Sequence, residues 1–222
     1  MINTIKGAIF DLDGTLINSL IIWDVMWEKF GQMFLGKNGF RPTQKDDKAI
    51  RTMTLVEATE YINGIYHFSD DSGKVLEAAN KIIEDFYANE VESKDGVKGF
   101  LEELLQKGVK MCVASATDLR LVKIAIEHCG LGKYFSEVLS CADIGKGKDK
   151  PDIYLLAMQK LGTSLEETCV FEDSHVAIET AHSIGMKTVG IYDDYNYGQD
   201  EIKKTANAYI AKGETLLKLL DK

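Results

Sequence analysis

Residues 9–20 read IFDLDGTLINSL, a stretch that places two aspartates directly after an apolar run. The run itself, residues 5–10 (IKGAIF), is short, mostly apolar and rich in isoleucine, which is typical of a buried β-strand. Asp11 and Asp13 follow this strand, and Gly14 allows the chain to turn sharply. Alternation along an extended chain puts both carboxylates on the same side. Two carboxylates about 4 Å apart repel by about 4 kcal/mol at an effective dielectric of 20, so we expect a compensating positive charge nearby.

Apolar runs typical of strands recur along the chain, and segments with helical periodicity lie between most of them. The runs comprise residues 109–115, 137–141, 168–173 and 187–193, with a weaker one at 207–211. Strands that alternate with helices favour a parallel sheet covered by helices on both faces. The sequence therefore predicts an α/β fold with a doubly wound, Rossmann-like parallel sheet.

The segment 19–92 interrupts this alternation, because it contains no run typical of a strand. Three of its stretches carry apolar residues at helical spacing, namely residues 20–34, 54–66 and 74–90. We therefore expect a core domain formed by residues 1–18 and 93–222, and an inserted all-α domain formed by residues 19–92.

Composition excludes several classes of partner. The net charge of −9 argues against nucleic acid, because a phosphate backbone needs a basic face. The four cysteines lie far apart without a CxxC pair, which favours reduced, buried thiols over a disulfide or metal framework. No signal-peptide pattern is present, and charged residues break the apolar residues near the N-terminus, so we expect a cytoplasmic protein without a membrane span. Nothing in the sequence indicates an oligomeric state.

Polar residues follow the ends of four of the expected strands. They are Asp11 and Asp13, then Ser115 with Ala116 and Thr117, then the loop lysines Lys146, Lys148 and Lys150, and finally Glu172 and Asp173. The carboxyl ends of parallel strands meet at one edge of a sheet, so we expect these groups to converge there.

Converging carboxylates with few cations call for a metal, and all-oxygen ligation favours Mg²⁺. Such a site suits a phosphoryl group, whose oxygens the Ser115 hydroxyl, the backbone N–H groups after it and a loop lysine could bind. One carboxylate can attack phosphorus as a nucleophile, and a second, two residues on, can act as general acid and base. We expect Thr117 to serve as the N-cap of the following helix.

Four motifs in order carry a resemblance to a known family: DLDGT at 11–15, SAT at 115–117, KDKPD at 148–152 and FEDS at 171–174. Together they resemble the haloacid dehalogenase superfamily of phosphatases and phosphotransferases. The helical insert is similar to the small cap of the branch that contains β-phosphoglucomutase and phosphoglycolate phosphatase. In this family the cap closes over the site and chooses the substrate.

The resemblance implies a role for each motif residue. Asp11 would be the nucleophile, and Asp13 would be the general acid/base and give its backbone carbonyl to Mg²⁺. Asp173 would join Asp11 as a carboxylate ligand of the ion, and Glu172 would support it through water. Ser115 and one lysine would hold the phosphoryl group, with the backbone of Ala116. The family's spacing of lysine before Pro-Asp selects Lys148, with Lys146 and Lys150 as alternatives.

These roles imply a Mg²⁺-dependent phosphatase that acts on a small phosphorylated metabolite through an aspartyl-phosphate on Asp11. A sugar-phosphate mutase of the β-phosphoglucomutase type is the first alternative, although that branch carries a histidine where Trp23 stands here. A non-catalytic, phospho-accepting regulator is the second. Such a module is far shorter, and it has no use for an acid in the position of Asp13.

Overall fold

The computed structural model describes residues 2–50, 53 and 55–220. The chain divides into two compact units. The first, which we call the core unit, comprises Met1–Leu20 and Val91–Lys222, and the second, the helical unit, comprises Ile21–Glu90. These boundaries fall at 20/21 and 90/91, where the sequence had placed them at 18/19 and 92/93.

A six-stranded parallel sheet forms the centre of the core unit, in the strand order β3-β2-β1-β4-β5-β6. Its strands are β1 (Gly7–Phe10), β2 (Lys110–Ser115), β3 (Glu137–Ser140), β4 (Thr168–Glu172), β5 (Lys187–Ile191) and β6 (Ala208–Ile210). All residues of β1 and β4 are buried, as expected for central strands covered on both faces. The predicted α/β fold with a parallel, Rossmann-like sheet is confirmed.

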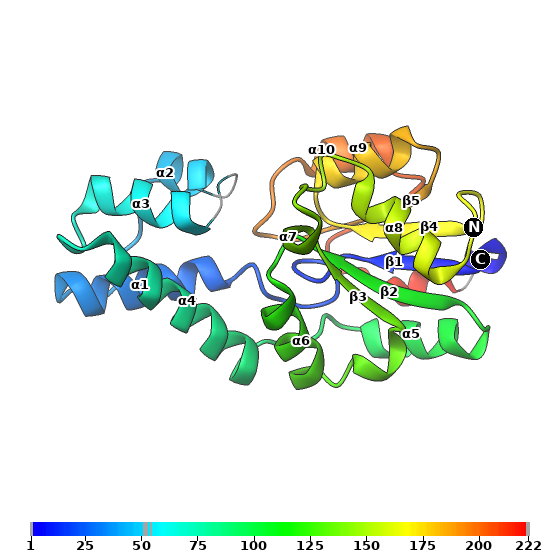
Figure 1. Ribbon diagram of the computed structural model, residues 1–222, viewed down its shortest axis with the longest axis horizontal. Helices are drawn as coiled ribbons and strands as arrows, with labels where there is room; N and C mark the ends of the chain where they lie inside the picture. The colour runs from blue at the N-terminus through cyan, green and yellow to red at the C-terminus, as the bar shows by residue number, and fades with distance from the viewer. Residues whose placement is uncertain (1, 51–52, 54, 221–222) are drawn as a thin grey trace. The chain divides into compact units, whose positions relative to one another are not determined.

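Helices cover both faces of this sheet (Figure 1). Helices α5 (Val97–Gln106) and α6 (Leu119–His128) lie on one face, and α8 (Asp152–Leu161), α9 (His175–Ser183) and α10 (Gln199–Thr205) lie on the other. Shorter elements complete the unit: α7 (Cys141–Ile144) and the 3₁₀ turns η1 (Ile2–Thr4), η2 (Gly132–Tyr134) and η3 (Leu216–Leu219). Helices α5, α6, α8 and α9 each bury an apolar stripe, as α5 does with Val97, Phe100, Leu101 and Leu104.

Aromatic packing fixes the two strands that carry the aspartates and the Glu-Asp pair. The ring of Phe10 at the end of β1 stacks on that of Phe171 in β4, with centroids 4.4 Å apart, and Phe100 of α5 meets both rings edge-on. Phe10 and Phe171 are also partners in the parallel ladder. The residues that follow them, Asp11 and Glu172, therefore leave the sheet side by side.

The described part of the helical unit contains four helices: α1 (Ile22–Leu35), α2 (Gln44–Ile50), α3 (Leu55–Tyr66) and α4 (Ser72–Asn89). Its apolar core includes Phe30, Ile62 and Val75, all fully buried. No strand occurs among its described residues, 21–50, 53 and 55–90, and α2 is a helix that sequence periodicity did not predict. Over all the residues that the structure describes, no helix is both long and apolar enough to cross a bilayer.

Candidate active site

The topology of the sheet brings the functional residues to one edge. Strand β1 pairs with β2 on one side and with β4 on the other, so the chain reverses its direction of travel across the sheet at β1. Ligands of open α/β sheets bind outside the carboxyl ends of the strands at such a reversal. Asp11 follows β1, Ser115 ends β2 and Glu172 ends β4.

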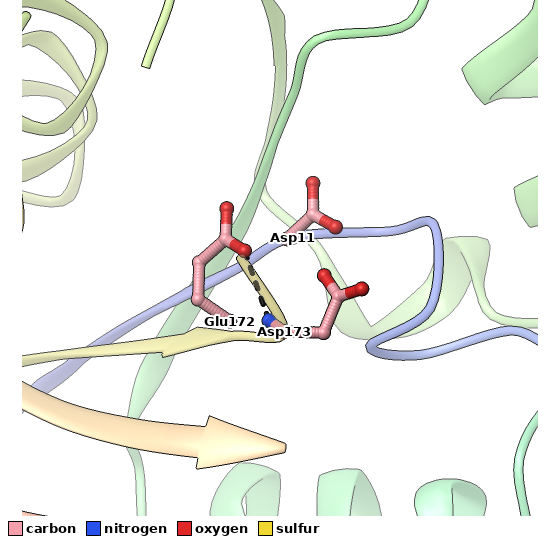
Figure 2. Close-up of side chains that lie close together, drawn as sticks. All are labelled: Asp11, Glu172 and Asp173. Atoms are coloured by element: carbon pink, nitrogen blue, oxygen red, sulfur yellow. Dashed lines mark hydrogen bonds between the residues drawn. The ribbon is translucent and has the colours of Figure 1, made fainter. Parts of the chain in front are cut away.

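Asp11, Glu172 and Asp173 form an acidic cluster at this edge (Figure 2). Each of them offers a carboxylate oxygen, and these oxygens all lie within 4.8 Å of one another. The three residues are 6%, 1% and 3% exposed. Close, buried carboxylates are costly to keep ionised, so their convergence requires compensation from other groups.

The backbone supplies part of that compensation. Glu172 Oε2 accepts hydrogen bonds from the main-chain N–H groups of Asp173, at 2.9 Å, and Ser174, at 3.0 Å. These bonds leave Oε1 of Glu172 to face the interior of the cluster, where it accepts from Lys148. Glu172 is thus oriented by its own loop.

Gly14 makes room for the cluster. Its φ of +74° lies in the left-handed region, and a Cβ atom built there would lie 2.3 Å from Oδ2 of Asp173. Any side chain at this position would displace the Asp173 carboxylate. The glycine of the DLDGT motif is therefore needed for close approach as well as for the turn.

Lys148 is the lysine that reaches the cluster. Its ammonium donates to Asp11 Oδ1 and to Glu172 Oε1, and its side chain is 10% exposed. Lys146 instead pairs with Asp152, and Lys150 pairs with Asp149, both at the exposed surface. Of the three loop lysines, the structure places only Lys148 beside the acids.

One ammonium does not balance three buried carboxylates. Burial raises the pKa of Asp11 from its ordinary 3.8 to about 8; Lys148 opposes this shift, while Glu172 and Asp13 add to it. Burial likewise raises the pKa of Asp173 well above its ordinary value, with Glu172 and Asp11 adding to the shift. Burial by itself disfavours the Lys148 ammonium, but the carboxylates of Asp11 and Glu172 raise its pKa well above 10.5. The cluster therefore favours a further positive charge.

The donor set suits a hard divalent cation. The clustered ligand atoms are carboxylate oxygens from buried residues, and such cations are held by oxygen donors in proteins. A cation beside Asp11 and Asp173 would favour their charged forms and so oppose the burial and the repulsion that raise their pKa values. The residues present therefore fit a metal ion.

Asp13 stands apart from the acidic cluster, and hydroxyl groups hold it. Its Oδ2 accepts from Thr117 Oγ1 at 2.8 Å and, at a longer 3.5 Å, from Ser115 Oγ. Ser115 Oγ accepts in turn from the main-chain N–H of Thr117 at 3.0 Å. The expectation that Thr117 caps the next helix was wrong, because Asp118 is the N-cap of α6 and accepts from the N–H of Arg120. Ala116 lies exposed in the turn before that helix.

Two polar residues at the site received no role from the sequence. Thr15 Oγ1 donates to Asp173 Oδ1 at 3.3 Å, and Asn196 Nδ2 donates to Asp173 Oδ2 at 2.7 Å. Thr15 is the last residue of the DLDGT motif, so the motif itself was the signal. Asn196 lies in the loop after β5, and its place beyond the carboxyl end of that strand is the signal that indicates it.

Comparisons with known proteins agree with this architecture. A family model described as haloacid dehalogenase-like hydrolase matches residues 8–191. The chain is 25% identical to the phosphorylated carbohydrates phosphatase of Thermotoga maritima, over 97% of this chain and 98% of that protein. It is 27% identical to the phosphoglycolate phosphatase of Pectobacterium atrosepticum, over 89% of this chain and 85% of that protein.

Solved structures show the same fold. A Thermotoga maritima protein provisionally described as a β-phosphoglucomutase matches with a TM-score of 0.83 at 24% identity, over 98% of this chain and 99% of that one. The similarity extends through both units, because almost the whole chain is covered.

Proposed function

We propose that this chain, which belongs to the haloacid dehalogenase-like hydrolase family, is a Mg²⁺-dependent phosphatase that hydrolyses small phosphate monoesters through a phosphorylated Asp11. One observation carries the proposal: Asp11 accepts from the Lys148 ammonium and clusters with two further buried carboxylates, and Asp13 is held by hydroxyls close by. The relatives named as phosphatases support the same reaction class.

The carboxylates of Asp11 and Asp173 would hold the ion together with the main-chain carbonyl of Asp13. Glu172 would support the ion through a water molecule. When bound, Mg²⁺ supplies positive charge that neutralises the acids and attracts phosphoryl oxygens. Lys148 and Ser115 would bind the remaining oxygens of the phosphoryl group, together with the main-chain N–H of Ala116. Their convergence at one sheet edge positions the phosphorus for attack.

In the first half of the reaction an oxygen of Asp11 attacks phosphorus, and the ester P–O bond breaks. Asp13, initially protonated, gives its proton to the leaving alkoxide as that bond breaks. The products are an acyl phosphate on Asp11 and a free alcohol. Thr117 orients Asp13 for this transfer through the 2.8 Å bond to Oδ2.

In the second half Asp13, now a carboxylate, takes a proton from a water molecule that attacks the same phosphorus. The bond between Asp11 and phosphorus breaks, which releases inorganic phosphate and restores the Asp11 carboxylate. Asp13 is again protonated, so the enzyme returns to its starting state. This second proton transfer distinguishes an enzyme that turns over from a phospho-accepting regulator.

The helical unit would act as a cap that selects the substrate, and the core unit would perform the chemistry. The relatives named for phosphorylated carbohydrates and for phosphoglycolate support a small phosphorylated metabolite as substrate. A sugar-phosphate mutase is the second candidate, because of the fold similarity to the provisionally described mutase. Trp23 stands where that branch carries a histidine, and it stacks on Trp27 within α1. A tryptophan in place of that histidine favours the phosphatase.

The direct experiment is phosphate release from a panel of monoesters, with Mg²⁺ and with EDTA. We expect release from a subset of sugar and small-acid phosphates that EDTA abolishes and added Mg²⁺ restores. Equal release in EDTA would overturn the metal dependence. If no monoester releases phosphate while sugar phosphates isomerise in the same samples, the mutase is the correct assignment.

A further inference from the structure

The loop between β5 and α10, residues 192–198, reaches the acidic cluster. Its Asn196 side-chain amide donates to the Asp173 carboxylate at 2.7 Å and also to the Asp173 main-chain carbonyl at 3.0 Å. Thr15 holds the other carboxylate oxygen at 3.3 Å. Asp173 is therefore fixed in orientation by donors from two separate segments of the chain.

Asp193 shapes the loop that carries Asn196. Its Oδ1 accepts from the main-chain N–H of Tyr195 at 2.8 Å, which is the local bond of an Asx turn. Its Oδ2 accepts from the Lys94 ammonium at 2.8 Å, and Lys94 donates as well to the carbonyl of Tyr192 at 3.0 Å. The side chains of Lys94 and Asp193 are 17% and 7% exposed, so this ion pair is largely shielded from solvent.

Lys94 is itself attached to the segment that follows the DLDGT motif. Its main-chain N–H donates to the carbonyl of Leu16 at 2.9 Å, and the N–H of Asn18 donates to the carbonyl of Glu92 at 2.9 Å. A bridge between Ile17 and Ser93 lies between these bonds. The backbone around Lys94 is therefore held against the segment that also carries Thr15.

We infer that Asn196 is a positioning residue that holds the Asp173 carboxylate ready for a divalent cation, and that the Lys94–Asp193 ion pair fixes the loop that presents Asn196. The inference rests on the proposed function, because it assigns Asp173 to the cation. An oriented carboxylate loses less freedom when it binds an ion than one that swings freely. Residues that orient metal ligands contribute about 10- to 100-fold to metal affinity.

The test measures Mg²⁺ alone, without substrate, by isothermal titration calorimetry on the full chain. Asn196→Ala should weaken Mg²⁺ binding by about 10- to 100-fold. Lys94→Met should weaken it in the same direction by a smaller factor, because the loop loses its anchor while the amide remains. Lys212→Met is the matched control: it breaks the exposed Lys212–Asp194 pair of the same loop and should leave Mg²⁺ affinity unchanged.

A second readout separates positioning from general damage. The Mg²⁺ concentration that gives half-maximal phosphate release should rise for Asn196→Ala, while the rate at saturating Mg²⁺ approaches that of the wild type. The melting temperature of Asn196→Ala in EDTA should match the wild type to within a few degrees, because Asn196 is half-buried on a surface loop.

Each contrary result has a separate meaning. Mg²⁺ affinity of Asn196→Ala within about 2-fold of the wild type would overturn the role of Asn196, as would a lowered rate that saturating Mg²⁺ does not recover. Equal affinities for Lys94→Met and Lys212→Met would overturn the role of the ion pair. Failure of the wild type to bind Mg²⁺ would overturn the proposed function instead.

Discussion

A buried carboxylate of the helical unit and one of the core unit have surroundings that shift their pKa values in opposite directions. Asp46 in α2 of the helical unit is 8% exposed, and Asp11 in the core unit is 6% exposed. Asp46 accepts hydrogen bonds from Thr43 Oγ1 at 2.6 Å, Tyr66 OH at 2.8 Å and Tyr61 OH at 3.1 Å. These hydrogen bonds lower the pKa of Asp46, and the bond from Thr43 contributes most.

Among the residues that the structure describes, no comparable set of neutral donors surrounds the Asp11 carboxylate. This carboxylate accepts from Lys148, which it shares with Glu172, and the buried Asp173 lies close by. Burial raises the pKa of Asp11 to about 8, which is the opposite direction from Asp46. Equal burial therefore says little about role. Asp46 accepts from hydroxyls of its own unit and stabilises that unit, whereas the carboxylates of the acidic cluster face one another and are arranged for a ligand.

The largest effect should follow removal of the proposed nucleophile. Asp11→Asn keeps the shape of the side chain but cannot form the acyl phosphate, so phosphate release should fall by about 10⁴-fold or more. Initial rates on the best monoester of the panel measure this. Release within about 10-fold of the wild type would assign the attack to another group.

Asp13→Asn should lower turnover by about 10²- to 10⁴-fold, the usual contribution of a positioned general acid and base. With a leaving group that needs no proton, such as a nitrophenolate, the first half reaction should proceed and the second should stall. Intact-protein mass spectrometry should then find one phosphoryl group per chain. If turnover with a nitrophenyl ester is unaffected, Asp13 is not the base.

Lys148→Ala should lower phosphate release by about 10²-fold, since it removes the charge that we propose binds the phosphoryl group and leaves the acids without their ammonium. Lys146→Ala is the matched control from the same loop. It breaks an exposed pair with Asp152 and should change the rate by less than about 2-fold. Equal losses for the two variants would contradict the placement of Lys148.

The raised pKa of Asp11 makes a prediction about stability and pH. A carboxyl whose folded-state pKa is above its unfolded value holds a proton in the folded protein that the unfolded chain has lost. The protonated Asp11 therefore stabilises the folded state fully below about pH 4, and this stabilisation is lost as the pH rises through about 8. In EDTA, Asp11→Asn should therefore unfold at a higher temperature than the wild type, and the difference should grow from pH 5 to pH 8. Thermal unfolding of both proteins across that range checks it, and a difference that shrinks with pH would contradict it.

The smallest effect on catalysis should come from the satisfied carboxylate. Asp46→Asn replaces one of the two oxygens that accept from the three hydroxyls by an amide NH2, which cannot accept. It should therefore lower the melting temperature, while kcat on a small monoester changes by less than about 2-fold. Asp70→Asn, an exposed acid of the same unit, is the control and should leave the melting temperature unchanged. A large loss of kcat in Asp46→Asn would remove the contrast between the two carboxylates.

The sequence by itself determined the family, the parallel α/β sheet and the residue types at the strand ends. Apolar runs such as GAIF in β1 and CVF in β4 lie on central strands because complete burial demands apolar sequence, a local property. The helical character of the insert also follows from local sequence periodicity. Helix α2 was not predicted, because its seven residues, QKDDKAI, carry little apolar periodicity.

Only the tertiary structure decided which of these groups meet. The pairing of Phe10 with Phe171 sets Asp11 beside Glu172, and the fold of the loop before α8 brings Lys148 into the cluster and leaves Lys146 and Lys150 outside. The bond from Thr117 to Asp13 and the bond from Asn196 to Asp173 also join distant segments. The physical reason is common to all of them. Parallel strands are joined through long crossovers, so the register that brings their ends together is set by packing of the whole sheet, which no local pattern records.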